Sequence, residues 1–274
     1  MLDTELGWTS YRQQSVSRWR GGEHSEEEDF VAEEVPVVLV YNGVSHVVML
    51  VTPTDLEDFA LGFSLTEGII GSARELLSAK VVHRANGIEV SVKIPEDRMQ
   101  CLADKGKNLT GRTGCGLCGA STLKQAIRQP PAVRSTVKIT ARQLNDALAA
   151  LADKQSLNKL TGAIHAAAWV DLERGITDVR EDVGRHNALD KLLGVLCRTG
   201  KNVNAGFVIV TSRASYEMVQ KTAFSGIGLL VAISAPTGLA IRLAEQAGIT
   251  LVGFARGSNH VIYSHPQRIV HYED

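Results

Sequence analysis

Short hydrophobic runs separated by polar turns dominate the first half of the chain. Residues 35–41 and 46–52 are rich in β-branched side chains, and the Asn42-Gly43 pair between them favours a tight hairpin turn. Residues 56–68 then place apolar side chains at helical spacing, with Asp55 as the expected cap. This pattern predicts a β-hairpin followed by an amphipathic helix.

A second hairpin is expected at residues 80–83 and 88–94, joined through Asn86-Gly87. These elements predict a small α+β domain over residues 31–134, which also carries a long connection rich in lysine, glycine and threonine. The domain shows no cluster of catalytic residue types, so we expect it to act as scaffold or interface. Residues 1–30 have few apolar anchors and an acidic run, which predicts a loosely held, solvated arm.

The pattern changes after residue 135, where helical stretches alternate with β segments. Thr140 is expected to cap a helix over residues 141–152, and two β segments follow at residues 163–170 and 176–180. Another helix is expected at residues 187–197. The remaining pattern predicts strand, helix, strand, helix and strand at residues 206–211, 216–224, 229–234, 238–247 and 249–254.

The last three strands are continuous apolar runs separated by helices, a pattern typical of parallel strands buried on both faces. We therefore expect an α/β domain over residues 135–274, with helices packed against its sheet. In such sheets, ligands bind beyond the carboxyl ends of the strands. The residues that follow each strand are therefore the first candidates for a binding site.

Small hydroxyl residues or glycine follow each of these strands and arginine follows two of them, although each exit alone also suits an ordinary capping turn. Two exits lead into helix N-termini, whose free N–H groups favour an anion. Three such exits on one edge would form a cradle for phosphate or a nucleotide. The exits are Thr211, Ser212, Arg213, Ala214 and Ser215; Ser234, Ala235, Pro236, Thr237 and Gly238; and Phe254, Ala255, Arg256, Gly257, Ser258 and Asn259.

A dense polar segment at residues 180–191 leads into the helix expected over residues 187–197. Asp182 is a candidate cap, and Asp190 and Lys191 suit a helix surface that faces water. The other polar groups offer a guanidinium, an imidazole and an amide to a planar heterocycle or its phosphates. They belong to Arg185, His186 and Asn187.

Cys115 and Cys118 stand close together in the glycine-rich residues 111–119. So much glycine disfavours regular structure, which leaves both thiols free to meet a partner. Beside Arg112, such a pair suits sulfur relay, redox exchange or half of a metal site.

Composition narrows the class of protein. The chain has 274 residues, of which 44% are hydrophobic and 22% charged, enough to bury a sizeable core. Its 29 basic and 30 acidic side chains give a net charge of -1, so we expect neither nucleic acid nor a membrane as partner. The absence of a signal-like or membrane-spanning apolar run predicts a cytoplasmic protein, in which a cysteine pair stays reduced.

Four strings of residues, in this order, resemble the formate dehydrogenase accessory sulfurtransferase family, FdhD. They are Gly-Arg-Thr-Gly-Cys-Gly-Leu-Cys-Gly at residues 111–119, Leu160-Thr161-Gly162 with His165-Ala166-Ala167-Ala168, residues 181–191, and residues 211–221. The resemblance implies a sulfurtransferase that takes persulfide sulfur from a cysteine desulfurase. It passes this sulfur to the molybdenum bis(guanine dinucleotide) cofactor, which formate dehydrogenase requires. A homodimer is also implied, with a C-terminal domain of the three-layer, cytidine deaminase-like α/β fold.

The same resemblance assigns roles to residues. Cys115 carries the persulfide, formed by attack of its thiolate on the outer sulfur of the desulfurase persulfide. Cys118 is either a second carrier or a resolving thiol that releases sulfur and closes a disulfide. The family's cofactor contact maps onto residues 254–259, and GDP is a partial mimic of the cofactor's guanine nucleotide arms. The expected binding site also includes Arg185, His186, Ser212 and Arg213.

Zinc deaminase chemistry is not expected to accompany this fold. His165 is not followed by a glutamate two positions later, and no proline precedes Cys115, so we expect no bound metal. Two other classes stay open: a zinc-binding structural protein, which would recruit Cys101 and His186, and a thioredoxin-like thiol redox protein. Cys101 and also Cys197 lie in apolar stretches and are expected to be inert core residues.

Overall fold

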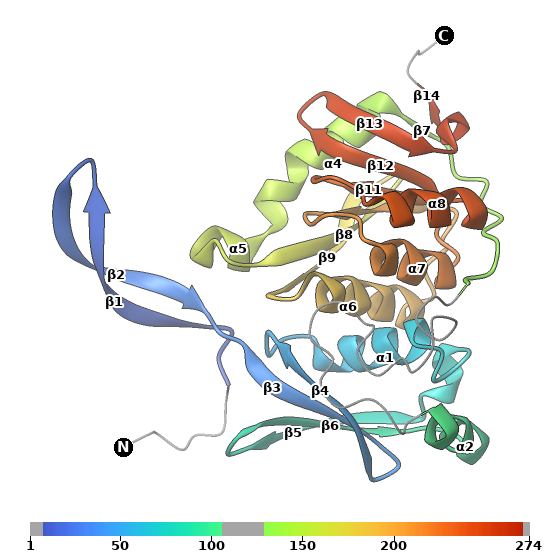
Figure 1. The fold of residues 1–274 in the computed structure, drawn as a ribbon, viewed down its shortest axis with the longest axis horizontal. Helices are drawn as coiled ribbons and strands as arrows, with labels where there is room; N and C mark the ends of the chain where they lie inside the picture. Colours follow the sequence, from blue (N-terminus) through green and yellow to red (C-terminus); the bar gives the residue numbers. More distant parts are fainter. Residues whose placement is uncertain (1–7, 106–128, 271–274) are drawn as a thin grey trace.

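The computed structural model describes residues 8–105 and 129–270, which form two packed α/β units and a projecting hairpin (Figure 1). The first unit is built on a four-stranded sheet in the order β4-β3-β6-β5. Both predicted hairpins are confirmed, and β3 also pairs in parallel with β6. The strands are β3 (Val35–Tyr41), β4 (Val44–Val51), β5 (Ser78–Arg84) and β6 (Gly87–Lys93).

Alternate residues of β3 point into the first core, which α1 (Leu56–Thr66) covers. A 3₁₀ turn (Ala73–Glu75) and α2 (Glu96–Lys105) complete the unit. Asp55 does precede α1, but the expected cap is wrong, because Asp55 has a φ of 53° and its side chain caps nothing. Its carboxylate instead lies 3.4 Å from the Arg180 guanidinium. Attraction to a cation on the second unit has replaced capping.

The N-terminal arm is a regular hairpin, which corrects the expectation of loose structure. β1 (Tyr11–Arg20) pairs antiparallel with β2 (Glu23–Ala32), and the tip of the ribbon projects away from both units (Figure 1). Cross-strand ion pairs from Arg18 to Glu27 at 3.0 Å and to Asp29 at 2.7 Å help to hold it. These two strands have no apolar alternation because neither face of the ribbon is buried in a core.

The second unit contains a six-stranded sheet in the order β13-β12-β11-β10-β8-β9. The prediction of parallel pairing is confirmed for β10, β11 and β12, and the two β segments before them form an antiparallel hairpin. A last strand, β13, was not anticipated. The strands are β8 (His165–Asp171), β9 (Gly175–Asp182), β10 (Gly206–Val210), β11 (Leu229–Ala232), β12 (Thr250–Arg256) and β13 (Asn259–Ser264).

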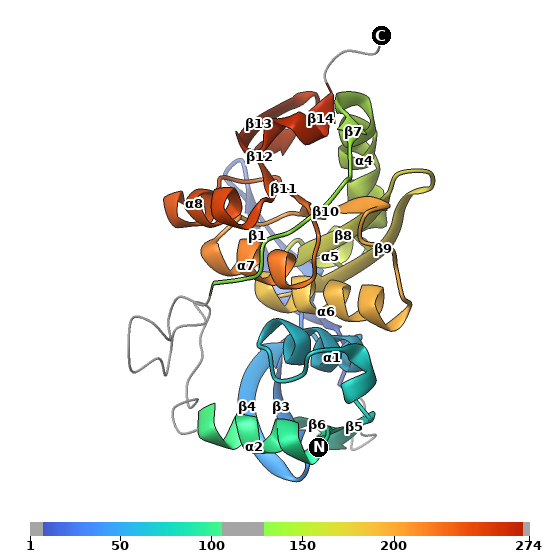
Figure 2. The ribbon, with the colours of Figure 1, turned by 90° about the vertical axis from the view of Figure 1, so that its right-hand side faces the viewer.

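Helices cover both faces of this sheet, so the unit has three layers (Figure 2). α6 (Arg185–Arg198), α7 (Tyr216–Phe224) and α8 (Gly238–Ala247) lie on one face. α4 (Ala141–Lys154) covers the other, and the short α5 (Ser156–Thr161) continues from it. Thr140 caps α4 as expected, through a reciprocal capping box with Gln143. The layers agree with the expected α/β class, and the closer likeness to cytidine deaminases stays a prediction.

Two small elements close the sheet's α4 side. β7 (Ile139–Thr140) pairs in parallel with β14 (Ile269–Val270). A 3₁₀ turn (Pro266–Arg268) directly precedes β14. Each strand is too short to give a period in the sequence.

The two units meet where α1 crosses α6, and glycine permits the close approach. A Cβ atom at Gly62 would lie 1.8 Å from the Asp190 carbonyl oxygen, and one at Gly194 would lie 1.9 Å from the Asp58 carbonyl oxygen. The first unit therefore provides a surface against which the second unit packs, in line with its expected role as scaffold or interface.

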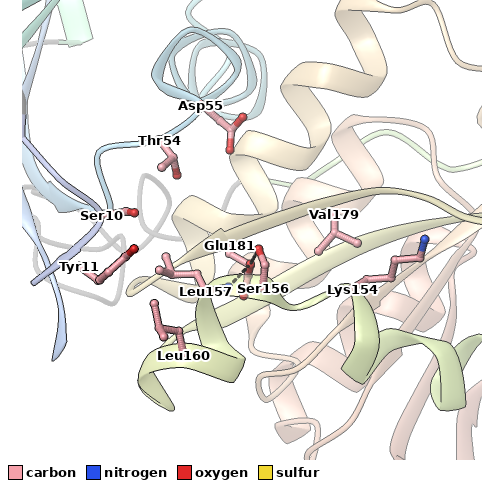
Figure 3. A pocket seen from close by; sticks show the side chains of 10 residues that line it. All are labelled: Ser10, Tyr11, Thr54, Asp55, Lys154, Ser156, Leu157, Leu160, Val179 and Glu181. Atoms are coloured by element: carbon pink, nitrogen blue, oxygen red, sulfur yellow. Dashed lines mark hydrogen bonds between the residues drawn. The ribbon is translucent and has the colours of Figure 1, made fainter. Parts of the chain in front are cut away.

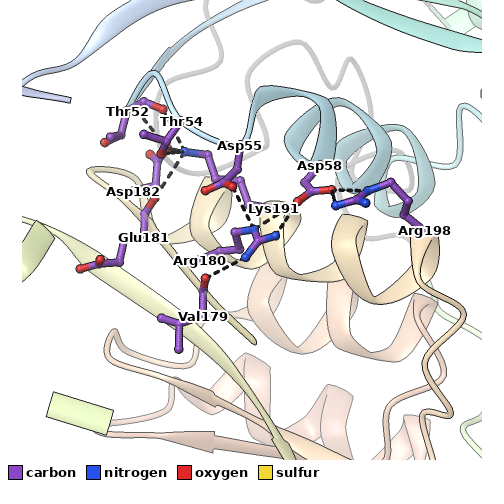
Figure 4. A network of polar contacts seen from close by, with 10 residues as sticks. All are labelled: Thr52, Thr54, Asp55, Asp58, Val179, Arg180, Glu181, Asp182, Lys191 and Arg198. Carbon is purple, nitrogen blue, oxygen red and sulfur yellow. Dashed lines mark hydrogen bonds and ion pairs between the residues drawn. The ribbon is translucent and has the colours of Figure 1, made fainter. Parts of the chain in front are cut away.

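A buried polar network reinforces this junction (Figure 4). Asp58 of α1 pairs with Arg180 at 2.7 Å and with Arg198 at 2.8 Å. Lys191 and Asp182 form a fully buried ion pair at 2.7 Å, and the Lys191 ammonium also donates to the Thr52 carbonyl. The expectation that Lys191 faces water is thus wrong, because a second unit covers this side of α6.

Candidate functional site

The three strand exits lie on one edge of the sheet and are tied together by hydrogen bonds. The Thr237 amide donates to the Ala214 carbonyl at 3.0 Å, which joins the first exit to the second. The Phe254 amide donates to the Ser234 carbonyl at 3.2 Å, which joins the second exit to the third. The expected juxtaposition of the exits is therefore present in the structure.

The first exit ends at the N-terminus of α7. Ser215 occupies the cap position, yet its hydroxyl is buried and finds no hydrogen-bond partner among the described residues. Arg213 is exposed, whereas Ser212 is buried and donates to the Arg213 carbonyl at 3.0 Å. Arg213 and the N–H groups of the first helical turn can therefore meet a ligand, and Ser212 supports the turn.

The second exit ends at the N-terminus of α8. The Thr237 hydroxyl accepts a hydrogen bond from the Ala240 amide at 3.3 Å, so this helix is capped by its own chain. Thr237 and Gly238 are exposed, and the remaining N–H groups of the first turn face the same edge. The second exit thus offers a weaker anion site than the first.

The third exit begins later than expected, because the strand does not end at residue 254. β12 continues through Arg256, and Gly257 turns the chain directly into β13. Phe254 has a φ of 51°, a strained conformation for an aromatic residue, and half of its side chain is exposed. The Arg256 guanidinium reaches across to the Ile233 carbonyl at 3.4 Å. An exposed ring and a cation therefore stand side by side at this end of the edge.

The N-terminus of α6 brings only part of the predicted segment to the site. Arg185 and His186 occupy its first turn. The Asn187 amide is buried and donates to the Asp182 carboxylate and to the Leu50 carbonyl, each at 2.9 Å. Asn187 is thus committed to the junction between the units and cannot read a heterocycle, which corrects the prediction.

His186 meets a residue that the sequence did not single out as functional. Its Nε2 lies 3.0 Å from a carboxylate oxygen of Glu217, in the first turn of α7. Burial lowers the pKa of His186 to about 3, assisted by the charge of Arg185. Burial raises the pKa of Glu217 to about 7. This buried pair holds a carboxyl group that titrates near neutral pH.

A second buried cluster lies one turn further along α7. The Lys221 ammonium contacts Asp190 at 2.9 Å, the Thr66 hydroxyl at 2.9 Å and Glu67 at 3.3 Å. Burial opposes the charge of Lys221, but Asp190 and Glu67 outweigh it and raise its pKa. The expectation that Asp190 faces water is wrong. The spacing of Glu217 and Lys221 on one helical face was the only signal in the sequence.

His165 begins β8, which agrees with the β segment predicted at residues 163–170. It is half-buried, and burial together with Arg185 lowers its pKa. The helix that starts nearby has Ala188 two positions after His186, so it also lacks the glutamate of a zinc deaminase. Among the described residues, no three His, Cys, Asp or Glu side chains form a group that could hold a metal ion.

The cysteines fall into two sets. Cys115 and Cys118 lie outside the described residues. Cys101 and Cys197 are both exposed and unbridged, which contradicts their expected place in the core. Burial of part of the Cys197 side chain still raises the pKa of its thiol, so it is a poor nucleophile at neutral pH.

A cavity of about 450 Å³ lies elsewhere, between the base of the β1–β2 hairpin, α5 and β9 (Figure 3). Glu181 on its wall accepts hydrogen bonds from the Leu157 amide at 2.9 Å and the Asn158 amide at 2.8 Å. Its carboxylate is therefore engaged in holding the start of α5. Of the described lining residues, none belongs to the three strand exits.

No helix within residues 8–105 and 129–270 has both the length and the apolar character needed to cross a membrane.

Comparison with known proteins gives consistent matches. The model of the FdhD/NarQ family matches residues 32–270. The sulfur carrier protein FdhD of Cupriavidus necator is 54% identical over 94% of this chain and 89% of its own length. That of Xanthomonas euvesicatoria pv. vesicatoria is 51% identical over 93% of this chain and 91% of its own.

One solved structure has the same fold. It is described as a formate dehydrogenase accessory protein from Desulfotalea psychrophila, and it matches with a TM-score of 0.74 and 24% identity. The match covers 95% of this chain and 99% of that one.

Proposed function

The chain belongs to the FdhD/NarQ family, and we propose that it carries sulfur for the maturation of formate dehydrogenase. The observation that supports this most is the identity of 54% to a protein named as a sulfur carrier. The Cys115 and Cys118 pair supplies the chemistry that such a carrier needs.

Cys115 is the proposed persulfide carrier. Its thiolate attacks the outer sulfur of a cysteine desulfurase persulfide, a new S–S bond forms, and the desulfurase cysteine leaves as a thiolate. No net oxidation occurs, because the sulfane sulfur only changes partners. The protein is in this sense a sulfurtransferase that acts in the cytoplasm.

Two alternative roles are proposed for Cys118, and the reaction in each is balanced. As a second carrier it accepts the outer sulfur by the same exchange. As a resolving thiol it attacks the Cys115 sulfur, which forms a disulfide and releases the outer sulfur as hydrosulfide, so the cysteines are oxidised while sulfur is reduced. The two roles differ in whether a disulfide accumulates after transfer.

The proposed acceptor is the molybdenum bis(guanine dinucleotide) cofactor, bound as a substrate through its nucleotide arms. The exposed Phe254 ring suits stacking on a guanine base. Arg213 and Arg256 suit the phosphates, as does the N-terminus of α7 with its unpartnered Ser215 hydroxyl. A homodimer is part of the same proposal.

Complementation tests the proposal. In cells that lack the gene for this chain, the wild-type protein should restore formate dehydrogenase activity, and Cys115→Ala should not. Cys197→Ala is the matched control, because Cys197 is also an exposed free thiol. Full restoration by Cys115→Ala would rule out the proposed carrier.

A further inference from the structure

Glu217 and His186 form a buried pair between the N-termini of α6 and α7. Their side chains are only 13% and 15% exposed, and the Glu217 carboxylate oxygen lies 3.0 Å from Nε2 of His186. His186 lies in the first turn of α6, beside Arg185. Glu217 lies in the first turn of α7, directly after the first strand exit. Water therefore screens this pair weakly, and neighbouring charges determine its protonation.

Burial is the largest influence on Glu217 and opposes its ionised form. Lys221 on α7 favours the ionised form, Glu67 after α1 and Asp190 on α6 oppose it, and Arg185 on α6 favours it least. The Lys221 ammonium itself contacts both Asp190 and Glu67. His165 on β8 also faces the pair, and it is neutral near pH 7 because its pKa is lowered. These opposing influences nearly balance near neutral pH, so one further charge close to Glu217 can change its protonation.

We propose that the cradle binds its anionic ligand together with one proton, and that Glu217 is the residue that takes up this proton. The inference rests on the proposed function, which supplies the ligand class, a guanine nucleotide with its phosphates. A phosphate bound at the N-terminus of α7 places a negative charge near Glu217, which lies in the first turn of that helix, and this repulsion opposes its ionised form. Glu217 then accepts a proton from water, which removes the buried negative charge beside the neutral His186.

A purely structural role for Glu217 has a different signature. A glutamate in the first turn of a helix stabilises the helix dipole when it is ionised. In that case its replacement lowers stability but leaves the pH dependence of ligand binding unchanged. Proton uptake on binding therefore separates the two roles.

Titration calorimetry of the full chain with GDP tests the proposal. Binding is measured at pH 6, 7 and 8, in buffers of different ionisation enthalpy, for wild type, Glu217→Gln and Glu173→Gln. Glu173 is the matched control, since it loses the same charge at the exposed turn between β8 and β9, on the opposite edge of the sheet. The titration of the GDP phosphates is common to all three proteins and cancels.

Wild type and Glu173→Gln should take up protons when GDP binds, and Glu217→Gln should not. If binding raises the Glu217 pKa by one unit, affinity falls roughly fivefold from pH 6 to pH 8 beyond the change in Glu217→Gln. Guanosine, which lacks phosphate, should show no proton uptake. The carboxyl ¹³C resonance of Glu217 in wild type should titrate at higher pH with GDP than without it.

Three results would overturn the inference. Equal pH dependence in wild type and Glu217→Gln removes Glu217 as the proton acceptor. An unchanged Glu217 titration in the presence of GDP does the same without any variant. Absence of GDP binding to folded wild type at every pH would instead overturn the proposed nucleotide site, and the inference with it.

Discussion

Gly62 of α1 lies against the backbone of Asp190 of α6, so close that a Cβ atom at Gly62 would come within 1.8 Å of the Asp190 carbonyl oxygen. Backbone atoms on both sides form this contact, so no flexible side chain can yield. The packing of the two units therefore depends on a glycine within a helix, where glycine is otherwise unfavourable by about 1 kcal/mol relative to alanine.

Gly62→Ala should destabilise the protein. Its gain in helix propensity is about 1 kcal/mol, and the cost of forcing α1 and α6 apart is about 3 kcal/mol or more. Chemical denaturation should thus show a net loss of about 2 kcal/mol. Gly238→Ala is the control, because a Cβ there meets only ordinary contact with Arg242 at 3.6 Å. Equal stability of Gly62→Ala and wild type would contradict the close approach.

The buried Lys191–Asp182 pair should matter far more than an exposed pair of the same type. Lys191→Met leaves the Asp182 carboxylate buried without its cation, which should cost about 3 to 5 kcal/mol of unfolding free energy. Lys159→Met breaks the exposed pair with Asp153 and should cost less than about 1 kcal/mol. Similar losses in the two variants would contradict the burial of Lys191 at the junction.

The raised pKa of Glu217 predicts a specific dependence of stability on pH. The unfolded chain releases this proton near pH 4.5 and the folded protein near pH 7, so wild-type stability falls as the pH rises through this window. Glu217→Gln should therefore gain on wild type from pH 5 to pH 7, by about 2 kcal/mol after solvent screening is considered. The lowered pKa of His186 acts in the opposite direction, but both proteins carry it. Parallel stability curves would contradict the raised pKa.

The exposed ring of Phe254 should contribute to nucleotide binding. Stacking on an aromatic ring adds about 1 to 3 kcal/mol per base, so Phe254→Ala should weaken GDP binding about tenfold with little loss of stability. Trp19→Ala, which removes an exposed ring at the tip of the β1–β2 hairpin, should leave GDP binding unchanged. Unaltered calorimetric affinity in Phe254→Ala would remove this ring from the site.

The sequence predicts strands best where burial leaves a clear hydrophobic pattern. β10, β11 and β12 are buried on both faces, so their apolar runs and their shared edge could be foreseen. The β1–β2 hairpin is held by cross-strand pairs and packs against no core. Polar residues therefore occupy both of its faces, and its sequence shows no apolar alternation. A pattern without a buried face resembles disorder.

The candidate site was foreseen only in part, because its charged residues depend on tertiary contacts. Arg213 follows β10, and Phe254 and Arg256 lie at the end of β12, so topology alone could place all three at one end of the sheet. Asn187 and Lys191 have the same polar character, yet the covering α1 unit buries them. Glu217 has a role only because α6 brings His186 to it, and no local spacing encodes that approach.

Persulfide loading tests the central claim most directly. The purified chain is incubated with a cysteine desulfurase and cysteine, and intact mass is measured before and after reduction. Wild type and Cys197→Ala should gain about 32 Da for each sulfur atom loaded, and should lose this mass on reduction. Cys115→Ala should gain none. Full sulfur loading of Cys115→Ala, or none in folded wild type, would contradict the account of this chain as a sulfur carrier.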